Sequence, residues 1–365
     1  MKKSLLALAV LAAFADVAQA QSNVTIYGSF DGGVRYQGDV NRSGNSRLSM
    51  GSNGTYNSNR IGFKGIEELG GGLNAHFTLE SGFNTGTGAL NNTNNQLFER
   101  SAFVGLGGQW GSLDLGRQFT VAFRTVGAYD PFNYKYSGII PLQQASVSAG
   151  TRVSNDIQYT GTFGPITARA EWALGEQAGS ARNGSHQALG LSYANGPLAV
   201  GAAYTLRKPD VRTAAQVTAN APANFQDNRD WTLGGAYTFG PARVAVGYAK
   251  ESQDQSTGNS TQQKNAWIGG SYDLTSVLGL SAAYYDTKVD TGVTAGTGKR
   301  QLFIIGTTYK LSKRTNLYAD LDYTRFKDGL IGANNVVVST NQLPLSSADG
   351  RSHLTGVSVG VNHVF

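Results

Sequence analysis

Charged residues in this sequence recur at alternate positions between apolar neighbours. Arg60 and Lys64 share one parity, and Ile61 and Phe63 occupy the other. Glu80 lies on the polar parity of the next segment of this kind. Alternate side chains of an extended strand point to opposite faces, so these charges are expected to line one wet face. Such a face attracts or repels ions by electrostatics and needs no covalent chemistry.

The composition leaves little material for covalent or metal chemistry. There are no cysteines, and the four histidines lack metal-ligand spacing: His76, His186, His353 and His363. Cysteine-based zinc and iron–sulfur sites are therefore excluded, and no metal or cofactor is expected. No Asp or Ser partner is patterned with the histidines, so no catalytic residue is predicted. The glycine runs at 70–72 and 105–111 precede no helix that could bind phosphate, which favours turns.

The elements that would position the charges are strands. Apolar and polar side chains alternate from residue 24 to 37, and the segments 230–239 and 356–365 repeat the pattern. Helical periodicity never persists for three turns, whereas period-two alternation indicates strands with one wet face. A mean hydropathy of −0.25 is too polar for a bundle of transmembrane helices. The chain is therefore predicted to be all-β.

Residues 1–20 have the pattern of a secretory signal peptide. Two lysines precede an apolar stretch at 5–15, and Ala18-Gln19-Ala20 forms a small-x-small cleavage pattern. The apolar stretch is shorter than the roughly 20 residues that a helix needs to span a bilayer. Cleavage after Ala20 is expected to leave an exported mature chain of residues 21–365.

The connections between the predicted strands alternate in length. Seven short turns lie near 68–72, 107–111, 161–164, 195–197, 240–241, 274–278 and 312–314. Eight long polar stretches lie near 38–57, 84–95, 118–150, 176–185, 208–228, 252–262, 289–298 and 328–351. This count predicts a 16-stranded antiparallel transmembrane barrel with its long loops at one end. A soluble all-β array of two packed sheets is the alternative, but it would not require all long loops at one end.

Seven blocks of the sequence form a recognisable series. They are residues 22–28 (SNVTIYG), 59–73 (NRIGFKGIEELGGGL), 79–83 (LESGF), 100–106 (RSAFVGL), 115–118 (LGRQ), 191–198 (LSYANGPL) and 361–365 (VNHVF). In content and order the series resembles the general porins of Gram-negative β-proteobacteria. The resemblance implies a trimeric, 16-stranded outer-membrane porin whose third external loop folds inward and narrows the pore.

The stretch 118–150 differs in composition from the other predicted loops. It is rich in aromatic and small residues, and an external loop of that kind would be poorly solvated. Packing against the inner wall would instead bury Phe123, Tyr129 and Phe132. The resemblance through block 126–132 implies that this stretch is the constriction loop. An ordinary surface or trimer-contact loop is the alternative. Shortening the stretch 38–57 is expected to change the conductance little.

Eight charged residues are candidates for the pore constriction. They are Arg60, Lys64, Glu80, Arg100, Arg117, Arg124, Asp130 and Arg152. The resemblance implies that Arg60, Arg100 and Arg152 form a basic wall facing the inward loop. Arg124 stands where relatives commonly carry an acidic or neutral residue, which favours a positive passage. In the alternative interpretation the arginines only solvate the lumen or pair with Glu80 and Glu99, and Asp114, Asp320 and Asp322 oppose a positive passage.

The expected function is diffusion of small hydrophilic solutes and ions across an outer membrane, with a preference for anions. A substrate-selective channel is the alternative, and the external loops leave open a secondary role as receptor or adhesin. The expected partners are two further copies in a homotrimer, outer-membrane lipid and lipopolysaccharide, and the barrel-assembly machinery. Phe365 resembles the terminal aromatic signal for assembly by that machinery. No nucleic acid partner and no enzymatic activity are expected.

Overall fold

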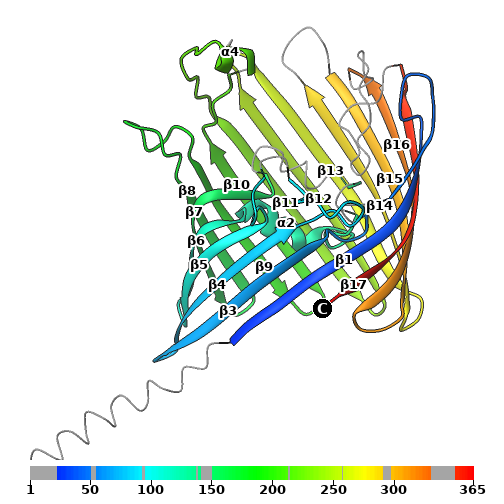
Figure 1. The fold of residues 1–365 in the computed structure, drawn as a ribbon, viewed down its shortest axis with the longest axis horizontal. Helices are drawn as coiled ribbons and strands as arrows, with labels where there is room; N and C mark the ends of the chain where they lie inside the picture. The colour runs from blue at the N-terminus through cyan, green and yellow to red at the C-terminus, as the bar shows by residue number, and fades with distance from the viewer. Residues whose placement is uncertain are drawn as a thin grey trace, which may run out of the picture.

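The computed structural model describes residues 23–50, 55–92, 95–136, 139–140, 150–212, 214–256, 258–290, 297–329 and 350–365. Most of them belong to one antiparallel sheet that closes into a barrel (Figure 1). The predicted signal peptide at 1–20 lies outside the described residues.

The strands follow one another around the barrel in chain order, and neighbouring strands are antiparallel, except that β2 and β3 both pair antiparallel with β1. They are β1 (Asn23–Gly38), β2 (Arg47–Met50), β3 (Arg60–Gly70), β4 (Leu73–Gly82), β5 (Ser101–Gly108), β6 (Gly111–Phe119), β7 (Arg152–Phe163), β8 (Ile166–Ala173), β9 (His186–Asn195), β10 (Leu198–Arg207), β11 (Asn228–Phe239), β12 (Ala242–Asp254), β13 (Ser260–Asp273), β14 (Leu278–Asp290), β15 (Thr297–Lys310), β16 (Thr315–Asp328) and β17 (His353–Val364). Pairing of β1 with β17 closes the sheet and leaves no free edge.

The prediction of a 16-stranded barrel is confirmed, although the sheet contains seventeen labelled strands. The short β2 pairs with the end of β1 at Val34–Gln37, and β3 pairs with its beginning at Asn23–Ser29. These two strands therefore share one position in the wall. The turns and long connections alternate as predicted, and both β1 and β17 have their terminal ends on the turn side (Figure 1).

Three short helical segments lie among the strands of the described chain. They are α2 (Val121–Val126), η2 (Gly127–Tyr129) and α4 (Ala214–Thr218). No described helix has the length and apolar character needed to cross a membrane. Among the same residues, no group of three or more His, Cys, Asp or Glu side chains could hold a metal ion.

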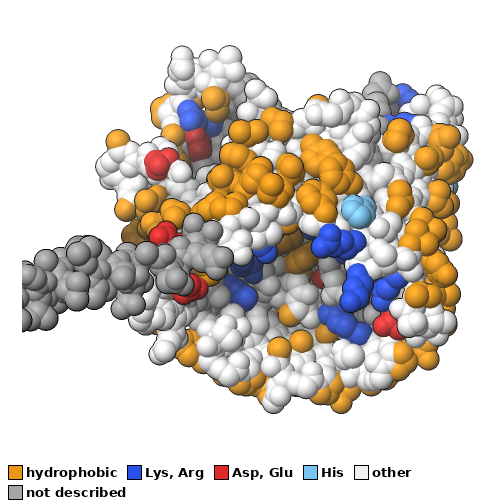
Figure 2. All heavy atoms as spheres, turned by 60° about the horizontal axis from the view of Figure 1, so that its bottom comes forward, with side chains coloured by type: hydrophobic (Ala, Val, Ile, Leu, Met, Phe, Trp, Pro, Cys, Tyr) orange, Lys and Arg blue, Asp and Glu red, His pale blue; other side chains and the backbone are white. Residues whose placement is uncertain are grey.

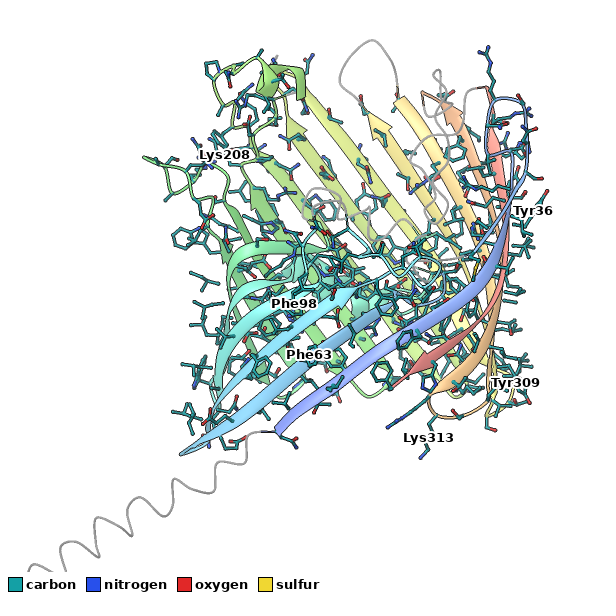
Figure 3. The ribbon with its side chains drawn as sticks, viewed as in Figure 1. Tyr36, Phe63, Phe98, Lys208, Tyr309 and Lys313 are labelled. Carbon is teal, nitrogen blue, oxygen red and sulfur yellow. The ribbon has the colours of Figure 1, made fainter. Side chains whose placement is uncertain are left out.

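The burial pattern of the barrel is the reverse of the pattern in a water-soluble protein. On β1, Val24 and Ile26 are 58% and 57% exposed, whereas Ser29 and Asp31 are completely buried. The apolar parity faces outward around the wall, where a bilayer would solvate it, and the polar parity faces inward. Figure 3 shows outward aromatic side chains towards both ends of the barrel, with Tyr36 near the loop side and Tyr309 near the turn side.

The C-terminal residue stabilises the contact between the first and last strands. The backbone N–H of Gly28 donates to the carbonyl of Phe365 at 3.1 Å, and the N–H of Phe365 donates back at 3.3 Å. The Phe365 ring stacks on Phe30, with 5.5 Å between the ring centroids. A Cβ atom at Gly28 would lie 2.5 Å from the Phe365 ring, so this close approach requires glycine.

Deleting Phe365 should therefore reduce the yield of folded barrel while export continues. The deletion removes two hydrogen bonds and one ring stack, each worth about 0.5–1.5 kcal/mol. The measurement is the heat-modifiable fraction in outer-membrane extracts, with Phe365→Tyr as the control that keeps the ring. A normal yield of folded barrel from the truncated chain would contradict this role.

Candidate pore constriction

The third long connection folds into the barrel and lies against its inner wall (Figure 1). Its helix α2 begins after Thr120, whose hydroxyl accepts a hydrogen bond from the N–H of Phe123 at 3.2 Å. Such a cap satisfies one of the free N–H groups of the first turn. A second one, the N–H of Val121, donates to the Glu171 carboxylate of the wall at 2.8 Å.

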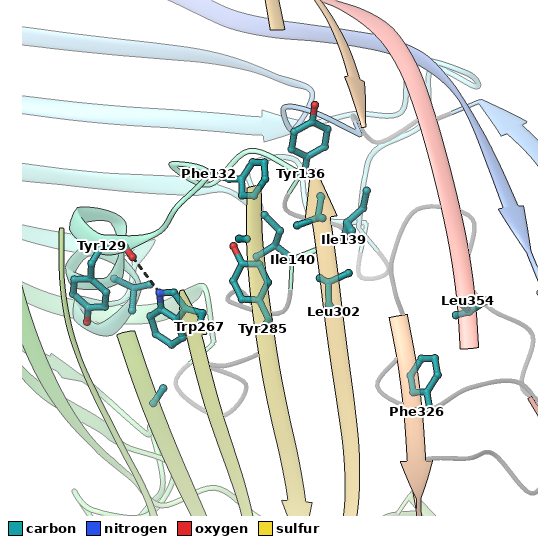
Figure 4. Close-up of a cluster of buried hydrophobic side chains, with 14 of the residues drawn as sticks. Tyr129, Phe132, Tyr136, Ile139, Ile140, Trp267, Tyr285, Leu302, Phe326 and Leu354 are labelled. Carbon is teal, nitrogen blue, oxygen red and sulfur yellow. Dashed lines mark hydrogen bonds between the residues drawn. The ribbon is translucent and has the colours of Figure 1, made fainter. Parts of the chain in front are cut away.

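Further hydrogen bonds tie the segment after α2 to the opposite wall. The indole N–H of Trp267 donates to the carbonyl of Tyr129 at 3.1 Å (Figure 4). The guanidinium of Arg243 donates to the carbonyls of Ala128 and Asp130 at 2.8 and 3.0 Å. Aromatic and aliphatic side chains of the segment, including Phe132, Tyr136, Ile139 and Ile140, pack in one buried cluster with side chains of the wall.

The wall provides room for this segment through inward-facing glycines. A Cβ atom at Gly190 would lie 2.5 Å from Val121, and one at Gly201 would lie 3.1 Å from Thr125. A Cβ atom at Gly234 would collide with the ring of Tyr129. Further round the wall, a Cβ atom at Gly269 would lie 2.7 Å from Pro131, and one at Gly306 would lie 3.1 Å from Tyr136. We call this set of five glycines the glycine track: Gly190, Gly201, Gly234, Gly269 and Gly306.

A second segment also folds inward, which was not expected. Residues 55–59, between β2 and β3, are held by Asp31, whose carboxylate accepts from the N–H groups of Tyr56 and Asn57 at 3.0 and 2.7 Å. The N–H of Tyr136 in the third connection donates to the carbonyl of Tyr56 at 2.8 Å. The end of the stretch 38–57 therefore contacts the third connection, which the sequence patterns did not indicate.

Between these two inward segments and the wall lies a cavity of about 330 Å³. Its lining contains four cationic side chains, Arg60, Arg100, Arg152 and Lys135, and a single carboxylate, Glu80. The described lining thus carries a surplus of three positive charges. In the view from the turn side, Lys and Arg side chains gather around the hollow of the barrel (Figure 2).

The arginines of the cavity are held in place by short contacts. Arg100 Nε lies 2.6 Å from one oxygen of Glu80, and Arg60 Nε lies 3.6 Å from the other. Arg152 Nε donates to the carbonyl of Arg100 at 2.6 Å, and its guanidinium lies 4.3 Å from the centroid of Phe119. Glu80 therefore spaces two arginines that would otherwise repel each other, and most of the positive charge remains uncompensated.

Four of the eight candidate residues thus line one cavity: Arg60, Glu80, Arg100 and Arg152. Lys64 lies on the same inward parity nearer the turn side, with its ammonium 5.6 Å from the centroid of Tyr27. Arg117 lies in a bulge between Gly116 and Gln118. It donates to the carbonyl of Glu99 and the hydroxyl of Ser154 and does not line the cavity. Arg124 points towards Gln118 and Phe119 and does not line the cavity either.

Asp130 has a structural role that the sequence did not indicate. Its side chain is buried and accepts hydrogen bonds from the N–H groups of Phe132 and Tyr134 at 3.3 and 2.5 Å. Burial raises the pKa of Asp130 to about 6, despite these bonds. It fixes the turn that follows η2 and adds no negative charge to the cavity lining.

The comparisons with known proteins agree with this architecture. The family model described as Gram-negative porin matches residues 7–329. The chain belongs to that family. The porin is 32% identical to an outer membrane porin protein of Bordetella pertussis, over 89% of this chain and 94% of the relative. It is also 32% identical to outer membrane porin protein 32 of Delftia acidovorans, over 100% of both chains.

Solved structures share the fold of this porin. An anion-selective porin from Comamonas acidovorans superposes with a TM-score of 0.78 at 24% identity, over 94% of this chain and 100% of that chain. OmpT, an outer membrane protein of Vibrio cholerae, gives 0.68 at 16% identity, over 95% and 100%. The protein is thus an outer-membrane diffusion porin with a closed 16-stranded barrel.

Two features of the porin's cavity could not be predicted from the sequence patterns. Lys135 lies in an irregular segment, where no periodicity indicates its direction, and only the tertiary fold brings it beside Arg60. Arg100 precedes β5, and Phe103 shares the inward parity with Ser101, opposite the outward Val104. Arg100 therefore contacts Glu80 from a position before the strand begins, where the alternation of the strand does not determine its direction.

Proposed function

We propose that this porin prefers anions, and that the two inward segments and the basic wall form its constriction. The observation that carries the proposal is the lining of four cationic side chains with one carboxylate. A unit charge about 4 Å from an ion contributes about 1 kcal/mol even in water, and more where the lumen narrows. The described part of the third connection supplies Lys135 to this lining and keeps Asp130 out of it.

The comparison supports the same proposal from another direction. The solved porin of Comamonas acidovorans, which has this fold, is described as anion-selective. One OmpT structure of Vibrio cholerae is described as a trimer, which supports a homotrimer here. The exposed apolar outer face suits outer-membrane lipid and lipopolysaccharide, and the terminal Phe365 suits insertion by the barrel-assembly machinery. Relatives that are porins support a channel without enzymatic activity.

The test of anion preference is the reversal potential of the purified porin in a planar bilayer under a KCl gradient. At about 0.15 M salt the Debye length is roughly 8 Å, so the lining charges still act on ions in the passage. The potential should have the sign for chloride over potassium and should shrink towards 1 M salt. A potential of the opposite sign at low salt would refute the proposal.

Lys135 makes the preference depend on pH. Burial, and secondarily the positive charge of Arg60, lowers the pKa of Lys135 to about 8. Its ammonium faces Arg60, the ring of Tyr56 and Asp31. A lysine is charged below its pKa, so raising the pH from 7 to 9 should discharge it and reduce the anion preference.

The measurement is the reversal potential between pH 7 and 9 in the native porin and in Lys135→Arg. Arginine keeps its charge over this range, so the variant should show a flatter pH profile. Identical profiles for both proteins would show that Lys135 is not the titrating group.

A further inference from the structure

The cavity in the constriction is lined by aromatic as well as cationic side chains. Its thirteen described lining residues comprise four aromatic, four cationic, one acidic and four uncharged polar side chains, and none is aliphatic. The aromatic ones are Tyr27, Phe119, Phe123 and Tyr134. An inorganic ion makes no ring contact with these side chains, whereas a solute that carries a ring of its own can.

Three of the rings form a continuous column that ends on an arginine. Ring centroids lie 4.1 Å apart for Tyr134 and Phe123 and 4.8 Å apart for Phe123 and Phe119, with nearly parallel planes. The guanidinium of Arg152 covers the other face of Phe119 at 4.3 Å. The hydroxyl of Tyr134 donates to the carbonyl of Phe123, which fixes the first ring against the second.

The stacking determines which part of each ring is exposed to the cavity. Both faces of Phe119 and Phe123 are covered by their neighbours in the column, so their edges line the cavity. Aromatic edges carry partial positive charge and pair favourably with the face of another ring. The edges also lie beside a guanidinium, so an apolar ring contact and a cation are available within one passage.

We infer that the constriction selects, among small anions, for aromatic carboxylates in which a planar ring bears the carboxylate directly. The carboxylate pairs with the guanidinium groups of the basic wall, and the ring lies against the edges of Phe119, Phe123 and Tyr134. This inference rests on the proposed anion preference and names the solute class of the same constriction.

The contacts allow such a solute to leave as well as to enter. Glu80 already binds Arg100 at 2.6 Å and lies 3.6 Å from Arg60, so a carboxylate in the cavity competes with a resident one. Conduction requires binding of this moderate strength. A ring contact worth about 0.5–1.5 kcal/mol favours the aromatic solute by a factor of about two to ten.

The test compares benzoate with cyclohexanecarboxylate, which has the same charge and a six-membered ring without aromatic character. Each is added at equal ionic strength to single channels of the native porin carrying chloride. Benzoate should reduce the chloride current by half at about two- to tenfold lower concentration. Equal half-blocking concentrations would overturn the inference.

Variants separate the ring contact from charge. Phe119→Leu should bring the half-blocking concentrations of the two solutes together, whereas Phe303→Leu on the outer face should leave the native ratio unchanged. Tyr134→Leu is a second variant on the same column if Phe119→Leu does not fold. A native ratio in both column variants would overturn the inference.

The proposed anion preference is tested separately, by the reversal potential in the same membranes. Chloride preference with equal block by the two carboxylates would refute only the aromatic selectivity. Potassium preference would refute the proposed function itself.

Discussion

Replacing Arg60 and Arg100 with glutamine should move the reversal potential strongly towards zero. The double variant removes two of the four positive charges of the cavity lining and leaves Glu80 without its partners. If each charge contributes about 1 kcal/mol, the ratio of chloride to potassium permeability should fall by more than about tenfold. The measurement is the reversal potential in a low-salt KCl gradient.

A matched control removes two positive charges outside the cavity. Lys313 and Arg314 lie in the exposed turn between β15 and β16, and Figure 3 shows Lys313 at the turn side of the barrel. Lys313→Gln with Arg314→Gln should leave the permeability ratio near its native value. Equal shifts in the two double variants would mean that overall charge, and not the cavity, sets the selectivity.

Arg124 gives a second comparison within the same series. The sequence suggested that Arg124 adds to the positive charge of the passage. The structure directs this side chain to Gln118 and Phe119, outside the cavity lining, so its effect should be smaller than that of Arg60. The reversal potentials of Arg124→Gln and Arg60→Gln measure this order directly.

Removing the inward part of the third connection should increase the single-channel conductance several-fold. The chain enters and leaves this connection at neighbouring points, because Thr120 donates to the carbonyl of Thr151 at 3.2 Å. A short Gly-Ser turn can therefore replace residues 121–149 without moving β6 or β7. The lumen of sixteen strands is too wide for the wall side chains alone to fill, so the deletion should leave an open passage.

The control deletion must spare both inward segments. Residues 213–222 of the connection between β10 and β11 are suitable, because Val211 donates to the carbonyl of Asn224 at 2.8 Å and already closes the loop base. Its removal should leave the conductance unchanged. A deletion within 38–57 is a poor control, since residues 55–59 contact the third connection. Equal conductances for both deletions would place the constriction elsewhere.

The barrel was predictable from the sequence because a single local rule governs it. Alternation of apolar and polar residues set the inward parity of Arg60 and Glu80, and short glycine turns set the strand count. The burial of Asp130 could not be predicted, because its hydrogen bonds come from irregular backbone. No periodic sequence pattern indicates the path of such backbone. The inward turn of residues 55–59 depends in the same way on Asp31, because its hydrogen bonds also come from irregular backbone.

The glycine track means that the third connection and the barrel wall cannot be exchanged independently between relatives. A foreign loop with a different bend would meet empty hollows at Gly190 or Gly234, and a foreign wall with side chains there would expel Val121 or Tyr129. Engineering of pore selectivity by loop grafting should therefore transplant the loop together with the facing positions of β9, β10, β11, β13 and β15. The positions of the glycines in the wall therefore determine where the loop packs.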